Sequence, residues 1–150
     1  MKIIAVTELP EDFDFLVEEA KSFGHNFLTK MKLEWTSGKN RFNANREILC
    51  IVFDEQGTTL GIGGLNIDPY ADDPSIGRIR HVYIRNDHQG KGIGHLILRR
   101  IIESAAGKFT VLRLRTHNLK AIEFYKSLGF ALVDQDDDPG HAFMELFLTK

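Results

Sequence analysis

The chain has 150 residues, of which 43% are hydrophobic and 27% are charged, and its formal net charge is −2. This composition predicts one globular domain with a substantial core, and the charge gives no overall attraction to nucleic acid or to an anionic membrane. No 18-residue apolar run and no leader with a basic and then an apolar region are present, so we expect neither membrane spanning nor secretion, but a cytoplasmic location.

The first third of the chain predicts a short strand and then two helices. The apolar run Met1–Thr7 is typical of a strand, and Pro10 with the acids after it suits the first turn of a helix. Apolar residues then recur at helical spacing on either side of Gly24: Phe13, Leu16, Val17, Ala20 and Phe23, and then Phe27, Leu28, Met31 and Trp35. Because such stripes usually face inward, we expect core packing for most of them.

A polar loop and a hairpin follow the helices. Residues 36–46 are polar and basic, which indicates an exposed loop. The runs Ile48–Asp54 and Leu60–Asp68 predict two strands joined at the turn Glu55–Gly57. The second strand carries three glycines that predict a bulge or the close approach of another group: Gly61, Gly63 and Gly64.

The stretch Gly77–Arg100 combines a strand, a glycine-rich turn and a helix. Alternation predicts that Ile79, His81 and Tyr83 share one face of the strand and that Arg80, Val82 and Ile84 share the other. After a polar elbow at residues 85–88, the helix shows an inward stripe that ends before Gly107: Leu96, Ile97, Ile101 and Ala105.

The turn between this strand and helix predicts an anion-binding site. Its sequence is Gln89-Gly90-Lys91-Gly92-Ile93-Gly94. Three glycines on the first turn of a helix would leave the unpaired backbone N–H groups open to a ligand. Two common phosphate motifs do not fit, because there is no Gly-Lys-Ser/Thr and because Ile97 stands where a dinucleotide fingerprint needs its third glycine.

Basic residues are concentrated around this turn: Arg78, Arg80, Arg85, Lys91, Arg99 and Arg100. A polyphosphate ligand would suit such a patch, although solvated strand and helix faces would also explain most of these residues.

The last third predicts a strand, a helix and two closing strands. Val111–Thr116 is typical of a strand, and Asn118 is a suitable N-cap for a helix that ends at Gly129. Phe130–Val133 and Ala142–Leu148 predict two strands separated by an acidic loop. The complete order is β-α-α-β-β-β-α-β-α-β-β, which predicts a mixed sheet with helices on its faces.

Two segments together carry a family resemblance. Gln89, Gly92 and Gly94 fill the pattern Gln/Arg-x-x-Gly-x-Gly/Ala, and residues 118–130 fill Asn-x-x-Ala-x-x-Phe-Tyr-x-x-Leu-Gly-Phe. In this order the two segments resemble the GNAT-type N-acetyltransferase superfamily over roughly residues 48–148. The resemblance implies an α/β (α+β) fold. It would be a single domain over residues 1–150, with a mixed, mostly antiparallel sheet of six to seven strands and helices on both faces.

The resemblance also implies acetyl-CoA as co-substrate. Backbone amides of Gln89 to Gly94, with Gly90, Lys91 and Ile93 included, would hold the pyrophosphate, and the backbone of Val82, Tyr83 and Ile84 would pair with the pantetheine arm. The thioester would lie where this strand parts from the next, with Asn118 facing the arm and Tyr125 near the sulfur. Residues 23–46 and the loop Pro69–Ser75 would form the acceptor pocket.

Direct acetyl transfer needs a neutral amine, stabilisation of an oxyanion and a proton for the departing thiolate. The resemblance makes Tyr125 the general acid. Many relatives have a Glu near the start of the central strand, where this chain has Arg78, which cannot act as a base but can bind a substrate carboxylate. His81 and His117 are candidate bases because imidazole titrates near neutrality, and a structural or capping role is the alternative for each.

We expect no metal and no disulfide. The six histidines show no ligand spacing, and Asp72 and Asp73 lack a third ligand, so a solvated turn is expected there. Cys50 is the only cysteine, and its apolar surroundings in the sequence predict a core residue.

Together these features predict an N-acetyltransferase that moves the acetyl group of acetyl-CoA to a primary amine of a small molecule, peptide or protein, by direct attack on the thioester. The alternative is a non-catalytic acyl-CoA-binding sensor or scaffold, since the Arg78 substitution affects catalysis and leaves the cofactor segment intact. Nucleic-acid and membrane partners are not expected, and a homodimer is compatible with the resemblance.

Overall fold

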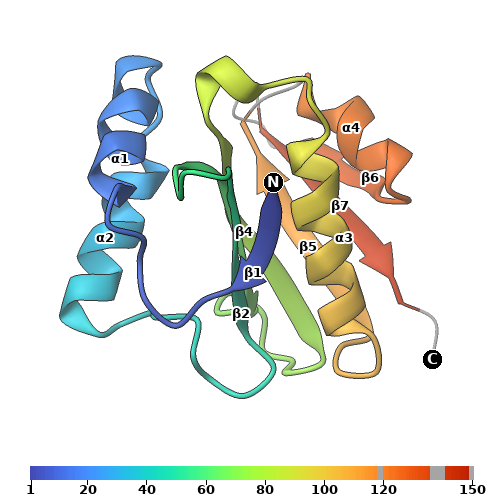
Figure 1. Cartoon of the computed structure of the whole chain (residues 1–150). Coiled ribbons are helices and arrows are strands. Elements are labelled where there is room, and N and C mark those ends of the chain that lie inside the picture. Colours follow the sequence, from blue (N-terminus) through green and yellow to red (C-terminus); the bar gives the residue numbers. More distant parts are fainter. Residues whose placement is uncertain (118–119, 136–140, 149–150) are drawn as a thin grey trace.

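The computed structural model describes residues 1–117, 120–135 and 141–148. Within these ranges the chain forms one seven-stranded sheet, four α-helices and a short 3₁₀ turn, η1 (Figure 1). The elements are β1 (Lys2–Ala5), α1 (Phe13–Ser22), α2 (Phe27–Ser37), β2 (Ile48–Phe53), β3 (Thr59–Ile67), β4 (Ile76–Ile84), η1 (Asn86–His88), α3 (Ile93–Ala105), β5 (Val111–Thr116), α4 (Ala121–Ser127), β6 (Ala131–Gln135) and β7 (Ala142–Phe147). The predicted order of strands and helices is confirmed.

The strands lie in the order β1-β2-β3-β4-β5-β7-β6. Every neighbouring pair is antiparallel except β4 and β5, which are parallel. The exception follows from connectivity, because α3 is the crossover that carries the chain from β4 back to the start of β5. The predicted mixed, mostly antiparallel sheet with helices on both faces is therefore confirmed.

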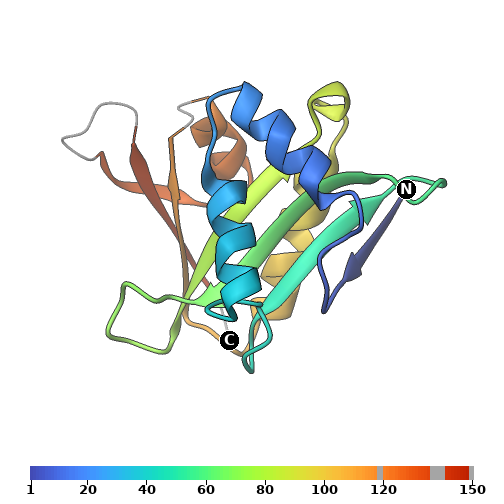
Figure 2. The same cartoon turned by 90° about the vertical axis from the view of Figure 1, so that its left-hand side faces the viewer.

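Helices cover the sheet on both faces. In Figure 1 α1 and α2 lie on one side of the sheet, and α3 and α4 lie on the other; Figure 2 shows α1 and α2 in front of the strands. The core under α1 and α2 includes Phe13, Leu16, Leu28, Met31 and Ile51. The core under α3 includes Cys50, Leu65, Ile79, Ile97 and Leu112. None of the helices in the described ranges has the length and apolar character of a membrane span.

Two apolar residues expected to face inward are exposed. Phe23 is 54% exposed, because α1 ends at Ser22 and Phe23 lies beyond its last turn. Leu96 is 39% exposed, while Leu98 is fully buried in its place. The buried face of α3 begins at the first residue of the helix, Ile93. Leu96 lies outside this face, so its side chain points toward solvent.

The three glycines of β3 allow other side chains to pack directly against the strand. A Cβ atom on Gly61 would lie 2.8 Å from Ile93, one on Gly63 would lie 2.6 Å from Ile97, and one on Gly64 would lie 2.3 Å from the Phe42 ring. The register of β3 and β4 also shifts between Ile62 and Gly64. Close approach, one of the two predicted alternatives, is confirmed and brings α3 close to the sheet, whereas the extra residue at this register shift lies in β4.

The predicted simple alternation of β4 is wrong. His81 has φ of +61°, and the β3 partners of its neighbours show an extra residue in β4 between Arg80 and Tyr83. The bulge reverses the alternation, so Ile79 packs in the α3 core and Tyr83 packs in the opposite core under α1 and α2. Positive φ at a histidine is an uncommon conformation that the sequence pattern does not reveal.

Candidate active site

A cavity of about 1020 Å³ lies beside the second half of β4. Among the described residues, β4 pairs with β5 only over Ile76–Arg78, and the later residues of β4 have no strand partner on that side. β4, β5, α2, the start of α3 and α4 all contribute to the wall. The cavity brings together most of the residues predicted for the site: Arg78, His81, Val82, Tyr83, Ile84, Gln89, Gly90, Gly92, Ile93, Gly94, His117 and Tyr125.

One predicted cofactor residue lies away from the cavity, and another is outside the described residues. Lys91 is exposed and does not contribute to the cavity wall. Asn118 lies outside the described residues, so its predicted roles as N-cap and as cofactor contact stay predictions.

The glycines before α3 have different conformations from those predicted. Gly90 and Gly92 precede the helix with φ of +77° and +84°, and only Gly94 lies within it. A Cβ atom on Gly90 or Gly92 would have no heavy atom within 4 Å, so the turn is open. A Cβ atom on Gly94 would lie 3.1 Å from the Phe124 ring, so this glycine allows α3 and α4 to pack.

The start of α3 has the properties of an anion site. Gly92 is its N-cap residue and provides no side-chain hydrogen bond to the first turn. The first backbone N–H groups of a helix lack intrahelical partners and carry the positive end of the helix dipole. An open turn that presents such groups to a cavity fits a phosphate or diphosphate group.

His81 is held in an apolar environment. Its ring stacks on Phe27 with centroids 6.3 Å apart and meets the edge of Phe42 at 6.0 Å. Among the described residues neither ring nitrogen has a hydrogen-bond partner. Burial, followed by the positive charges of Arg80 and Lys30, lowers the pKa of His81 to about 3. The pKa of His81 therefore lies well below the intrinsic value of imidazole, and His81 is uncharged at neutral pH.

Tyr125 faces the cavity from α4. Its ring contacts Phe124 at 5.1 Å and Phe130 at 5.8 Å between centroids. Burial raises the pKa of Tyr125 to about 12, so its hydroxyl carries a proton at neutral pH. A protonated phenol on the cavity wall has the form that a general acid requires.

His117 lies just after β5, and its ring contacts that of His141 with centroids 4.0 Å apart. Over the described ranges, no group of three or more His, Cys, Asp and Glu residues is arranged to hold a metal ion.

Comparison with known proteins identifies the family. The model of the acetyltransferase (GNAT) family matches residues 11–130. The chain belongs to this family. An L-amino acid N-acyltransferase, MnaT of Escherichia coli strain K12, is 31% identical over 101 residues. That match covers 62% of this chain and 56% of MnaT, so the chain spans little more than half of this relative.

Solved structures show the same fold. A protein from Exiguobacterium sp. 255-15 superposes with a TM-score of 0.82 at 23% identity, covering 97% of this chain and 92% of its own. The yncA protein from Salmonella typhimurium, solved with its cofactor acetyl-CoA, superposes with a TM-score of 0.74 at 20% identity, covering 100% and 96%. At these identities the likeness establishes the GNAT fold.

Arg78, near the start of β4, is largely enclosed by other groups. Its guanidinium lies 3.8 Å from the Asp68 carboxylate and 5.0 Å from the Tyr70 ring. Burial lowers the pKa of Arg78 from its usual value, and Asp68 opposes this effect. The pair is nearly buried, with side-chain exposures of 13% and 1%, so much of the arginine charge is balanced locally.

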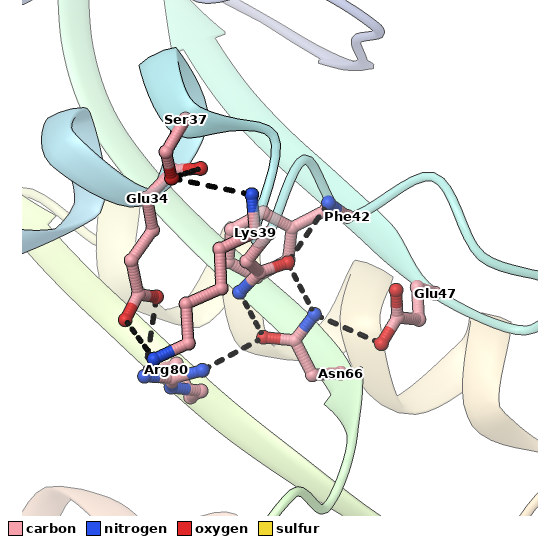
Figure 3. A network of polar contacts seen from close by, with 8 residues as sticks. Glu34, Ser37, Lys39, Phe42, Glu47, Asn66 and Arg80 are labelled. Atoms are coloured by element: carbon pink, nitrogen blue, oxygen red, sulfur yellow. Dashed lines mark hydrogen bonds and ion pairs between the residues drawn. The ribbon is translucent and has the colours of Figure 1, made fainter.

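Arg80 is fixed by a polar network that the sequence did not reveal. Figure 3 shows the network, which joins α2, the following loop, β3 and β4. The Arg80 guanidinium lies 3.8 Å from the Glu34 carboxylate and donates a 3.4 Å hydrogen bond to Asn66. Asn66 and Asn40 donate to each other at 2.9 Å, and Asn66 also donates to Glu47 at 2.9 Å. Asn66 is a hint in the sequence, as a polar residue between Leu65 and Ile67.

The segment expected to form the acceptor pocket divides between two roles. Leu28 and Met31 are buried in the core, as expected for a helical stripe. Phe23, His25, Phe27 and Lys30 line the cavity, together with Tyr70 from the loop after β3. Sequence periodicity does not separate Phe27 and Lys30 from the core residues of α2, because all of them lie on one helix.

Proposed function

We propose that this chain is an N-acetyltransferase that transfers the acetyl group of acetyl-CoA to a primary amine of a small molecule, peptide or protein. Residues 1–150 would form its acetyltransferase domain. The observation that carries the proposal is the open Gly90–Gly92 turn at the start of α3, which faces a cavity between two parted strands. Membership of the acetyltransferase (GNAT) family supports the same function.

The residues present fit acetyl-CoA. The open turn would accept the diphosphate on the amides of Gln89 to Gly94, and a side chain on Gly90 or Gly92 would project into that space. Backbone groups of Val82, Tyr83 and Ile84, in the part of β4 that β5 leaves unpaired, would bind the pantetheine arm as an added strand does. When bound, acetyl-CoA would supply an activated carbonyl, and Asn118 and Tyr125 would lie beside its thioester.

The protein's contribution to the chemistry would come from positioning and proton transfer. Tyr125 would donate its proton to the leaving sulfur, a role supported by its place on the cavity wall and by its protonated state. General acids of this kind typically contribute about 10²- to 10⁴-fold to the rate. Direct attack requires no protein nucleophile. Cys50 does not suit that role, since burial raises its pKa to about 11.

The acceptor would enter between α2 and the loop after β3. Arg78 would contact an anionic group of the acceptor, such as a carboxylate, although Asp68 already balances part of its charge. The similarity to an L-amino acid N-acyltransferase makes amino acids the first acceptors to test. Of the two candidate bases, His81 is disfavoured by its low pKa. His117 remains a proposed general base.

The test is thiol release from acetyl-CoA in the presence of the twenty L-amino acids, a polyamine and a peptide with a free N-terminus. Turnover of at least one amine, lost when acetyl-CoA is replaced by CoA, would support the proposal. Tight binding of acetyl-CoA with no turnover of any amine would instead favour the acyl-CoA-binding sensor, for which the arginine at position 78 is the motivating observation.

A further inference from the structure

One end of the cavity is lined by positive charge. Within the described ranges, none of the residues that line the cavity is Asp or Glu. Four permanently cationic side chains contribute to the wall: Lys30, Arg78, Arg80 and Arg115. A cleft lined by one sign of charge concentrates ligands of the opposite sign, so this wall favours an acceptor that carries negative charge.

This end of the cavity is separate from the turn where we place the diphosphate. The turn lies at the end of β4, where Gln89 Nε2 donates a 3.5 Å hydrogen bond to the Ile84 carbonyl oxygen. Arg78 is six residues earlier than Ile84 in the strand, which at roughly 3.3 Å per residue corresponds to about 20 Å. The arginines of β4 therefore face the acceptor end of the cavity and not the diphosphate.

Tyr70, in the loop after β3, packs against both arginines of β4. The Arg78 guanidinium lies 5.0 Å from the centroid of the Tyr70 ring, and the Arg80 guanidinium lies 6.0 Å from it. Both arginines precede the irregular part of β4 and are two residues apart, so their side chains project from the same face of the strand. Two guanidiniums side by side can each bind one carboxylate of the same ligand.

The carboxylates next to the arginines leave part of this binding capacity unused. Asp68 is 3.8 Å from Arg78, which donates no hydrogen bond to any described residue. Figure 3 shows that the Glu34 carboxylate is shared, at 3.8 Å from Arg80 and 4.0 Å from Lys39. Direct charge-assisted hydrogen bonds are about 2.7–2.9 Å long. Both arginines therefore keep N–H groups that a ligand can use.

Lys30 adds a positive charge that no carboxylate balances. α2 places Phe27, Lys30 and Glu34 along one face at helical spacing. Phe27 stacks on the His81 ring at 6.3 Å and Glu34 pairs with Arg80, so this face of α2 lies against β4. Lys30 lies between these two contacts, lines the cavity and forms no ion pair with a described residue. Its ammonium is available to an anionic ligand.

We propose that the acceptor is a primary amine with two carboxylates, namely an acidic amino acid such as L-glutamate or L-aspartate. One carboxylate would bind Arg78, and the other would bind Arg80 and Lys30. The proposal rests on the function proposed above and names its substrate class. The same cations would favour the neutral form of the bound amine, which is the form that attacks the thioester.

The test compares L-glutamate with L-glutamine and L-aspartate with L-asparagine in the thiol-release assay. The members of each pair have nearly the same shape and differ by one carboxylate. We expect kcat/KM to be about 10- to 100-fold higher for the acid, because charge-assisted hydrogen bonds are lost with the amide. Spermidine, which is cationic and has no carboxylate, should be the poorest acceptor. Equal values within both pairs, or a preference for spermidine, would overturn the proposal.

Lys30→Gln tests the protein side of the interaction. The substitution leaves no carboxylate unpaired, and it should raise the KM for the acidic amino acid about 10-fold while the KM for acetyl-CoA stays unchanged. Lys32→Gln is the matched control, because Lys32 lies on the same helix, pairs with Asp14 and does not line the cavity. An unchanged KM for the acid in Lys30→Gln would contradict the proposal.

Arg78 is best tested together with its partner. Arg78→Gln combined with Asp68→Asn removes both charges, so no buried carboxylate is left unpaired. We expect kcat/KM for the acidic amino acid to fall at least 10-fold, and the comparison of acids with amides in wild type decides the proposal if this variant does not fold. If wild type turns over no amine, the proposed function fails. If wild type acetylates amides or spermidine as well as acids, only this inference fails.

Discussion

Gly63 in β3 lies directly against Ile97 in α3, such that a Cβ atom on Gly63 would come within 2.6 Å of the Ile97 Cγ2 atom. Ile97 is fully buried in the core under α3, so any movement of its side chain would disturb its core neighbours. We therefore predict that Gly63→Ala lowers the free energy of unfolding by about 1–3 kcal/mol through overpacking. Urea denaturation measures this directly.

A double-mutant cycle provides the control for this contact. Ile97→Ala alone should cost about 2–5 kcal/mol because it leaves a cavity. Combined with Gly63→Ala, the total loss should be smaller than the sum of the single losses, since the added methyl group fills part of that cavity. Simple additivity of the two changes would show that the two residues do not constrain each other.

The Gly92 turn allows backbone strain to be separated from ligand binding. Gly92 has φ of +84° at the start of α3, and Gly107 has φ of +77° beyond its end, and both have open space around a Cβ atom. Alanine at either position should cost about 1–2 kcal/mol of stability, since L-residues disfavour this conformation. Only Gly92→Ala should also weaken acetyl-CoA binding, measured by calorimetry.

Gly92→Glu should weaken acetyl-CoA binding further than Gly92→Ala, because it adds a negative charge where we place the diphosphate. Gly107→Glu is the matched variant at the far end of the helix and should leave the affinity unchanged. An unchanged acetyl-CoA affinity in Gly92→Glu would contradict the proposal that this turn binds the diphosphate.

The open glycine turn before α3 and the order of strands and helices along the chain could be predicted because their signals are local. The glycines at 90, 92 and 94 are adjacent in sequence, and each helix of the fold has a periodic apolar stripe. The close approach predicted at the glycines of β3 is also confirmed. Glycine weakens a strand, so three glycines in one strand indicate that other groups pack directly against its backbone.

The parts of the site that were missed depend on contacts between distant residues. The bulge at His81 reverses the faces of β4, yet it arises from pairing with β3 and leaves no mark on the alternating sequence. The hydrogen bond from the Asn86 backbone N–H, beside the cavity, to Glu19 also joins residues 67 positions apart, so no local pattern predicts it. The low pKa of His81 likewise comes from burial that no spacing predicts.

His81 should make stability depend on acid pH. Its pKa is about 3 in the folded protein and 6.5 for the free side chain, so the unfolded chain binds the proton first as the pH falls. The free energy of unfolding should therefore decrease as the pH is lowered from about 6.5 toward 3. His81→Asn should flatten this part of the curve, because asparagine does not titrate and tolerates positive φ. An equally steep decrease in the variant would assign the acid sensitivity to other groups.

Tyr125→Phe should separate acetyl transfer from cofactor binding. The substitution removes only the hydroxyl and keeps the ring that packs against Phe124 and Phe130, so the fold and the acetyl-CoA affinity should be preserved. We expect kcat to fall by about 10²-fold or more, because the departing thiolate would lose its proton donor. Since the pKa of Tyr125 is about 12, wild type should show no alkaline decline from this residue below about that pH. A thioester with a better leaving thiol, such as a thiophenyl acetate carried on the same binding arm, should suffer a smaller loss in the variant. An equal loss with both thioesters would contradict the assignment of Tyr125 as the acid.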